Sequence, residues 1–203
     1  MTATPGLTAL RKKLQSDLQN CYACPLHRDI EGYYPVPGEG PLNAQIMLVG
    51  RNPGVTENNV GKPFCGMSGS RLDDVLHDVR LASNRIVRRQ RIYVTNVVKC
   101  FTEGNAIPPR VCVDACCAHV ETELQIVKPK LLITCGTEAK GWWTRLVGTK
   151  TLTRVPACFH MIHPAAALRN STFEAVLRHQ TRLLRRLVSR LHLTEGKRSV
   201  RKK

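Results

Sequence analysis

Four cysteines are the residues whose type and spacing most directly suggest chemistry. Cys21 and Cys24 form a C-x2-C pair in a polar stretch, Cys100 follows an apolar run, and Cys116 stands near the start of an expected helix. Four thiolates can close a tetrahedral zinc site or hold a 4Fe–4S cluster. The spacing alone does not choose between these two groups.

The chain holds nine cysteines among 203 residues. We expect an intracellular protein, because no apolar stretch is long enough to span a bilayer and the first residues lack the apolar core of a signal peptide. Disulfides are uncommon in a reducing compartment, which favours metal or cluster ligation. The other five cysteines are expected not to be ligands, although Cys112 and Cys117 stand close enough to Cys116 to replace it.

The charge of the chain favours a polyanionic partner. The net charge is +16, with 31 Lys and Arg residues against 15 Asp and Glu residues. An excess of this size indicates contact with nucleic acid. We expect residues 1–195 to form a single domain, and the basic segment 196–203 to be a disordered tail.

The elements that must position these residues follow from the apolar pattern. Short apolar runs predict buried strands at residues 45–49, 92–96, 130–135 and 153–157. Helical spacing predicts helices at residues 7–18, 70–79, 113–127 and 172–193. Ser68 or Ser70 is expected to cap the second of these helices. Alternation of strands and helices predicts a mainly parallel α/β sheet, whose ligands bind beyond the carboxyl ends of the strands.

Between Cys21 and Arg169 the chain carries short motifs in a fixed order. They are VPGEGPLNAQIMLVG, GRNPGVTENNVGKPFCGMSGSRLDDVL, YVTNVVKC, KPKLLITCG and HPAAALR. Together with the C-x2-C pair, this series closely resembles the type-4 uracil-DNA glycosylases. The resemblance implies a three-layer α/β/α fold with a central four-stranded, mainly parallel sheet. It also implies a structural 4Fe–4S cluster on Cys21, Cys24, Cys100 and Cys116.

The resemblance further implies an enzyme of DNA base-excision repair. Such a glycosylase flips uracil, or another deaminated base, out of DNA and hydrolyses the N-glycosidic bond, leaving an abasic site. It implies that Phe64 stacks on the flipped base, that Asn96 reads the base edge, and that His163 stabilises the departing uracil anion. Gly50 and Arg51 are expected beside the base. His160 is a weaker candidate than His163.

The first motif departs from the type-4 pattern. Type-4 members carry G-E-A-P-G, whereas Arg51 and Asn52 occupy the second and third positions here. A G-x-N-P-G motif is similar to the mismatch-specific and single-strand-selective branches, and it implies that Asn52 positions the attacking water. Asn58 replaces the aspartate of an acidic pair, which leaves Glu57. These departures motivate a second hypothesis, a catalytically weak or inactive DNA-binding relative of the same fold.

The expected partner is uracil-containing DNA, either double- or single-stranded, and we expect a monomer. Ser68 and the backbone amides of residues 66–69 are candidates for holding phosphates. Leu168 and Arg169 are expected beside the flipped nucleotide. A third hypothesis, a zinc-stabilised interaction module, differs from the other two in the metal that the cysteines would hold.

Overall fold

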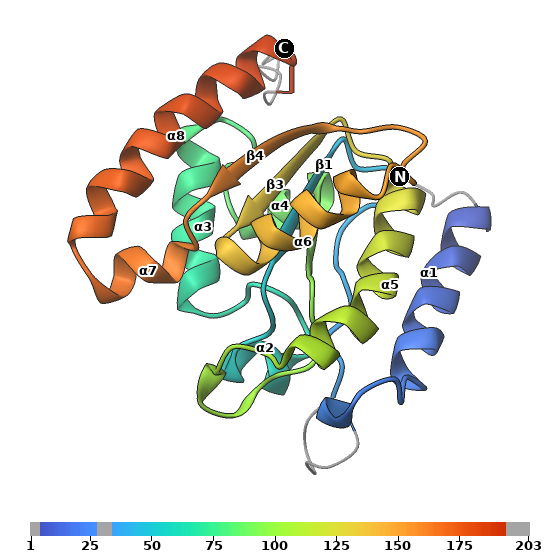
Figure 1. Ribbon diagram of the computed structural model, residues 1–203. Coiled ribbons are helices and arrows are strands. Elements are labelled where there is room, and N and C mark those ends of the chain that lie inside the picture. The colour runs from blue at the N-terminus through green and yellow to red at the C-terminus, as the bar shows by residue number, and fades with distance from the viewer. Residues whose placement is uncertain (1–4, 28–33, 194–203) are drawn as a thin grey trace, which may run out of the picture.

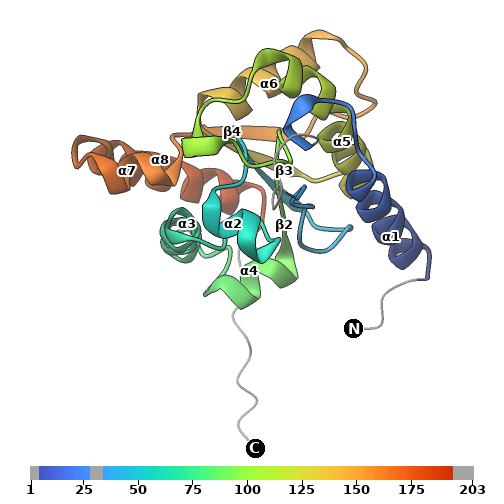
Figure 2. The same ribbon diagram turned by 90° about the horizontal axis from the view of Figure 1, so that it is seen from below.

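The computed structural model describes residues 5–27 and 34–193. A four-stranded sheet forms its centre, with helices on both faces (Figures 1 and 2). The strands are β1 (Ile46–Gly50), β2 (Ile92–Asn96), β3 (Leu131–Cys135) and β4 (Ala157–Met161). All three strand pairings are parallel, and the order across the sheet is β2-β1-β3-β4. This architecture confirms the predicted three-layer α/β/α fold; the expected tail at 196–203 lies outside the described residues.

Helices connect the strands and cover the sheet. The α-helices are α1 (Pro5–Gln19), α2 (Val55–Val60), α3 (Met67–Asp78), α4 (Arg85–Arg91), α5 (Arg110–Val127), α6 (Thr137–Gly148), α7 (Pro164–Arg169) and α8 (Thr172–Arg190). Two short 3₁₀ helices are η1 (Pro25–His27) and η2 (Glu103–Asn105). No helix among residues 5–27 and 34–193 has the length and apolar character that a membrane span requires.

The alternation of side chains along β1 produces two separate cores. Ile46 and Leu48 point to the face covered by α3 and α8, whereas Met47 and Val49 point to the face covered by α5 and α6. Successive residues of a strand face opposite sides, so a strand buried on both sides reads as a continuous apolar run. This is why the sequence pattern predicts β1, β2 and β3 correctly.

The structure corrects two predictions about local structure. The fourth strand is Ala157–Met161, not residues 153–157. Proline has no amide hydrogen, so pairing with β3 begins only after Pro156, where the Ala157 amide donates to the Lys130 carbonyl at 3.0 Å. Helix α3 begins at Met67 with Gly66 as its N-cap, and no side chain caps it. The predicted capping by Ser68 or Ser70 is therefore wrong.

Candidate active site and cysteine cavity

A cavity of about 570 Å³ opens at the carboxyl ends of the strands. Predicted site residues that line it are Arg51, Asn52, Phe64, Ser68, Asn96, His163 and Arg169. They come from the ends of β1 and β2, from the turn before α3, and from α3 and α7. Residues that follow parallel strands meet at one edge of a sheet, so the topology brings together positions more than a hundred residues apart.

Gly50 lies beneath this cavity without lining it. The parallel register places Gly50 beside Asn96, at the ends of β1 and β2. A Cβ atom on Gly50 would lie 2.4 Å from Asn96 Oδ1 and 2.8 Å from the Phe64 ring. Only glycine leaves room for both side chains to approach the strand end. Gly50 thus allows Asn96 and Phe64 to meet at the end of β1, and its expected place beside the base stays a prediction.

The Phe64 ring is buried and faces His163. The two ring centroids lie 5.6 Å apart, with 23° between the ring planes. Phe64 has a φ angle of +50°, in the left-handed region that non-glycine residues rarely adopt. Its carbonyl packs against Gly69 of α3, where a Cβ atom would come within 1.9 Å of that oxygen. The ring is therefore fixed by an unusual backbone conformation as well as by packing.

His163 is the N-cap of α7 and has a defined protonation state. Its Nδ1 accepts a hydrogen bond from the Ala165 amide at 3.2 Å, which leaves the hydrogen of the neutral ring on Nε2. Burial lowers the pKa of His163 to about 4, with the charges of Arg51 and Arg169 adding to the effect and Glu138 opposing it. At neutral pH the ring is uncharged and has one N–H donor.

The Asn52 side chain is held on both sides. Arg51 Nε donates to Asn52 Oδ1 at 2.6 Å, and Asn52 Nδ2 donates to Thr102 Oγ1 at 3.1 Å and to the Pro53 carbonyl at 3.0 Å. The Arg51 guanidinium also donates to the Asn105 carbonyl at 2.7 Å. Arg51 therefore fixes the orientation of the amide next to it.

Comparison with known proteins identifies the family of this chain. A family model described as the uracil DNA glycosylase superfamily matches residues 37–187. The chain belongs to this superfamily. The matched residues include every strand of the sheet and every predicted residue that lines the cavity.

Several curated relatives within the superfamily are type-4 uracil-DNA glycosylases, as the motifs predict. The one from Pyrobaculum aerophilum is 38% identical over 125 residues, which cover 62% of this chain and 60% of the relative. The one from Sulfurisphaera tokodaii is 28% identical over 191 residues, which cover 87% of this chain and 84% of the relative. A type-5 uracil-DNA glycosylase from Thermus thermophilus is 35% identical over 101 residues, 46% of each chain. The chain thus spans about 60% of the length of the first relative.

The cavity contains two carboxylates with different surroundings. Both oxygens of Glu57 accept hydrogen bonds from backbone amides, Oε2 from Gly54 at 3.1 Å and Oε1 from Gly66 at 2.7 Å. Glu138, in the first turn of α6, lines the cavity. Burial of the Arg51 guanidinium lowers its pKa, and the negative charge of Glu138 acts in the opposite direction. Sequence reasoning did not single out Glu138. Its position in the sequence could have indicated it, because Glu138 follows the third strand closely, as Asn52 follows the first.

Two further predicted residues lie at the margin of the site. Leu168 is 50% exposed on α7 and does not line the cavity, whereas the neighbouring Arg169 does. His160, on β4, also lines the cavity, and its Nδ1 is hydrogen-bonded to Thr134 Oγ1 at 2.6 Å. His160 thus belongs to the cavity wall rather than to the solvent-exposed surface.

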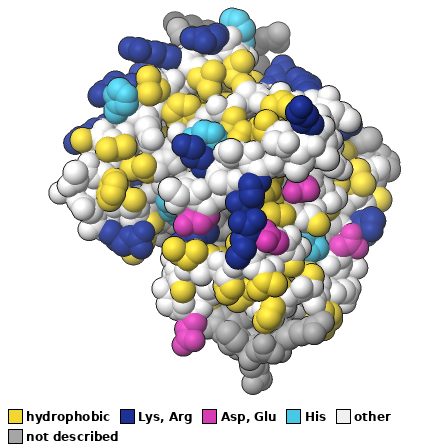
Figure 3. All heavy atoms as spheres, viewed as in Figure 1, with side chains coloured by type: hydrophobic (Ala, Val, Ile, Leu, Met, Phe, Trp, Pro, Cys, Tyr) yellow, Lys and Arg dark blue, Asp and Glu magenta, His cyan; other side chains and the backbone are white. Residues whose placement is uncertain are grey.

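Exposed arginines cover the outer side of α8, in the region where Figure 3 shows several Lys and Arg side chains. The exposed arginines of this helix are Arg178, Arg182, Arg185, Arg186 and Arg190. Opposite them, Leu177, Leu184 and Val188 are buried against the sheet. This amphipathic division confirms the predicted last helix and gives the protein a basic surface next to the cavity.

The four predicted ligand cysteines line a second, small cavity. Cys100 and Cys116 are buried, while Cys21 and Cys24 are half-buried. The remaining lining is largely apolar. The Lys99 amide donates to Cys116 Sγ at 3.3 Å. The structure therefore brings together residues from the loop after α1, the segment after β2 and helix α5.

The three neighbouring cysteines of α5 are placed differently with respect to this cavity, and the buried Cys112 thiol is hydrogen-bonded to Cys24. Cys116 lines the cavity, whereas Cys112 and Cys117 do not. Burial raises the pKa of Cys100 to about 12, with the charges of Cys116 and Cys24 adding to it. Among the residues that the structure describes, no three His, Cys, Asp or Glu side chains are gathered as a metal ion would hold them.

Proposed function

We propose that the chain is a uracil-DNA glycosylase. It flips uracil out of DNA into the 570 Å³ cavity and hydrolyses the N-glycosidic bond, leaving an abasic site. The observation that carries the proposal is that Phe64, Asn96 and His163 line one cavity in a member of this superfamily. An aromatic face, an amide and a neutral N–H donor are the groups that a planar base with a developing negative charge requires.

His163 would stabilise the leaving group. Uracil departs as an anion, and a donor aimed at its oxygen lowers the barrier most as that charge develops. The proposal is supported by the Nδ1 contact with the Ala165 amide, which leaves Nε2–H as the donor of the neutral ring. A neutral donor also avoids the desolvation cost of burying a cation in the empty site. Phe64 would stack on the base, and Asn96 would match its edge with one donor and one acceptor.

Asn52 would position the attacking water. An amide is a poor base, so it orients water rather than deprotonating it. This suits a reaction in which the base has largely departed before water attacks the sugar. Arg51 Nε occupies one side of Asn52 Oδ1, and the second lone pair of that oxygen is available to a water molecule. In this proposal Arg51 supports the reaction by fixing the amide.

We further propose that Cys21, Cys24, Cys100 and Cys116 hold a 4Fe–4S cluster. The residues fit this group in their donor chemistry, because four thiols from three segments line one largely apolar cavity. The cluster would supply a structural cross-link, since hydrolysis of a glycosidic bond moves no electrons. Iron and acid-labile sulfide analysis of anaerobically purified protein tests this proposal, and a colourless protein that contains zinc instead would contradict it.

A uracil-release assay tests the proposed activity. Cluster-loaded protein is incubated with oligonucleotides that contain uracil opposite guanine or in a single strand, and alkali then cleaves any abasic site. We expect free uracil and alkali-labile strands, with no cleavage of a matched thymine-containing strand. Salt-sensitive DNA binding without base release would instead favour the inactive DNA-binding relative, which the replacement of an acidic residue by Arg51 motivates.

A further inference from the structure

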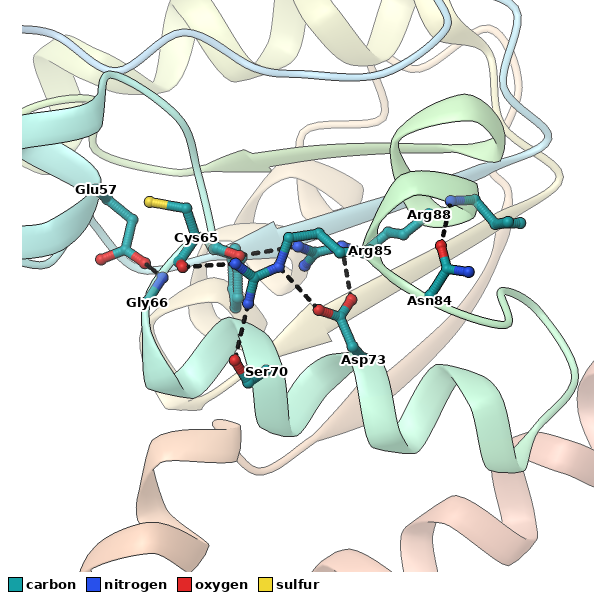
Figure 4. A network of polar contacts seen from close by, with 10 residues as sticks. Glu57, Cys65, Gly66, Ser70, Asp73, Asn84, Arg85 and Arg88 are labelled. Atoms are coloured by element: carbon teal, nitrogen blue, oxygen red, sulfur yellow. Dashed lines mark hydrogen bonds and ion pairs between the residues drawn. The ribbon is translucent and has the colours of Figure 1, made fainter.

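Two arginines of α4 hold the backbone of the turn that carries Phe64 (Figure 4). Arg88 Nη2 donates to the Phe64 carbonyl at 2.9 Å, and Arg85 Nη1 donates to the Cys65 carbonyl at 2.8 Å. The Arg88 side chain is only 2% exposed, so this contact lies in the protein interior. Both contacts join residues that lie 20 or more positions apart in the sequence. The turn is therefore anchored by a helix from another part of the chain.

Asp73 of α3 links the two arginines to each other. Its Oδ1 lies 3.0 Å from Arg88 Nε, and its Oδ2 lies 3.1 Å from Arg85 Nε. Arg85 also donates to Ser70 Oγ at 2.8 Å, which ties the pair to α3 a second time. A buried guanidinium needs a compensating charge, and a carboxylate can serve two guanidinium groups through its two oxygens. We call Asp73, Arg85 and Arg88 the α4 clamp.

The next residue of the turn is held by a charged side chain as well. Glu57 of α2 accepts a hydrogen bond from the Gly66 amide at 2.7 Å, on the cavity side of the same turn. Three consecutive residues thus each have one backbone group bound to a charged side chain. A surface turn does not require a charged side chain on each of three consecutive residues. Burying an arginine also costs free energy, because its charge is removed from water. The arrangement indicates a turn whose position matters.

The backbone of Phe64 explains why an anchor is needed. Its φ angle of +50° is unfavourable for a residue with a side chain, and such conformations persist only where the surroundings enforce them. The Phe64 carbonyl lies between Gly69 on one side and Arg88 on the other. Moving this carbonyl would rotate the ring away from its stacked arrangement with His163.

We propose that the α4 clamp is a positioning device for the base-stacking ring of Phe64. The clamp acts through the backbone of residues 64 and 65 and does not touch the base. This inference rests on the proposed function, in which Phe64 stacks on the flipped uracil. A guanidinium suits the role because it presents several donors in a rigid plane, whereas a lysine offers a single charged centre.

A double-mutant cycle between the clamp and the ring tests the proposal. The variants are Arg88→Met, Phe64→Ala and the combination of the two, compared with the parent by single-turnover uracil release at saturating protein. We expect Arg88→Met to slow release by up to about 100-fold, because small displacements of a positioning group have effects of that size. In the Phe64→Ala background we expect the same change to add less than about twofold, since residues that act as a unit are not additive. Equal slowing in both backgrounds would overturn the proposal.

Two further variants separate positioning from general destabilisation. Arg71→Met removes an arginine of α3 whose ion pairs are with Asp74 and with Glu174 of α8 rather than with residues 64–66, and it should leave the release rate unchanged. Arg88→Lys should restore the charge and the folding temperature without restoring the rate. If Arg88→Met does not fold, Arg85→Met takes its place, since that side chain is 32% exposed, and a smaller slowing is expected.

A measurement that does not depend on activity completes the test. Hydrogen exchange across residues 62–69 should become faster in Arg88→Met and stay unchanged in Arg71→Met. Unchanged exchange in a folded Arg88→Met protein would overturn the clamp even if the parent released no uracil. An inactive parent with faster exchange in Arg88→Met would instead contradict the proposed function and leave the clamp supported.

Discussion

The two cavities of this protein differ in how their side chains are held. In the 570 Å³ cavity, which we call the base cavity after its proposed function, His163 and Asn52 have hydrogen-bond partners within the protein, Ala165 and Thr102 respectively. In the cysteine cavity, only scattered single contacts approach the thiols, such as the one from His119 Nε2 to Cys21 at 3.3 Å. Two polar side chains of the first site are thus oriented by the protein itself, whereas the second site is a set of thiols that the proposed cluster would join.

This difference predicts different consequences of mutation. Removing a side chain from the base cavity should slow the reaction while the fold persists, because its neighbours are held independently. Removing a thiol from the cysteine cavity should loosen three chain segments at once, because a bound cluster would be their common link. Variants in the two cavities should therefore differ in whether they lower the reaction rate or the stability of the fold.

The largest effect is expected for Cys100→Ser. This change removes one of four proposed cluster ligands, so we expect loss of bound iron and sulfide and a decrease in the unfolding free energy of several kcal/mol. Cys117→Ser is the matched control, since Cys117 is half-buried on α5 and does not line the cavity. Thermal unfolding and iron content measured on both variants check the prediction. An equally stable, iron-loaded Cys100→Ser protein would contradict the ligand assignment.

His163→Ala should slow uracil release by roughly 100- to 1,000-fold, the range found when one donor to a developing anion is removed. The folding temperature should fall less than in Cys100→Ser, because the ring faces the cavity and contributes one hydrogen bond and its stacking on Phe64 to the fold. Single-turnover kinetics at saturating protein measure the rate. His160→Ala, which alters the same cavity from β4, provides the comparison and should have a smaller effect. A reversal of the two would assign the donor role to His160.

Asn52→Ala should slow release by roughly 10- to 100-fold while DNA binding is retained, because the change removes the positioning of water and not the cavity. Asn58→Ala, an asparagine of α2 outside the cavity lining, serves as the control. Rates and dissociation constants measured on the same uracil-containing duplex separate the two effects. An unchanged rate for Asn52→Ala would remove the water-positioning assignment.

Acid should destabilise the protein through His163. The pKa of this residue is lowered from 6.5 to about 4 in the folded protein, so the unfolded chain takes up the proton at higher pH. The stability contributed by the neutral ring is therefore fully present above pH 6.5 and decreases as the pH falls towards 4. Urea unfolding across this range measures the dependence. The slope should become flatter in His163→Gln, and an unchanged slope would contradict the assignment.

The smallest effect is expected on the basic surface of α8. Replacing Arg182 and Arg186 by Gln should weaken binding to DNA of any sequence and reduce the dependence of log K on log salt by about one for each lost phosphate contact. Lys13→Gln on α1, which removes an exposed charge paired with Asp17, is the control. Release rates at saturating protein should not change. A rate decrease would place α8 within the reacting complex.

The sequence predicts the fold well where local patterns decide it. Three strands and the helices α1, α3, α5 and α8 follow from apolar periodicity, whereas α4 and α6 were not predicted. The assignment of Cys21, Cys24, Cys100 and Cys116 as ligands stays a prediction. The β4 boundary depends on pairing with β3, which the run around Pro156 does not reveal. The identity of the cysteine on α5 depends on which face of that helix meets the loop after α1.

Site geometry could be predicted only in part for a related reason. Motifs indicate which residues meet at the strand ends, because parallel topology places those ends together. They do not indicate that the Asn96 side chain lies close against Gly50, or that Arg88 reaches the Phe64 carbonyl. Both are close approaches between distant segments, and they depend on the packing of α3 and α4 against the sheet.

The segment after β2 connects the two cavities over a very short distance. Asn96 lines the base cavity and Cys100, four positions later, lines the cysteine cavity. Between them, the amides of Val97 and Val98 donate to the carbonyls of Gly50 and Arg51, each at 2.9 Å. If Cys100 is a cluster ligand and the proposed function holds, oxidation or iron starvation would disturb the strand end that carries Asn96, and the iron supply of a cell would then limit its repair of deaminated DNA.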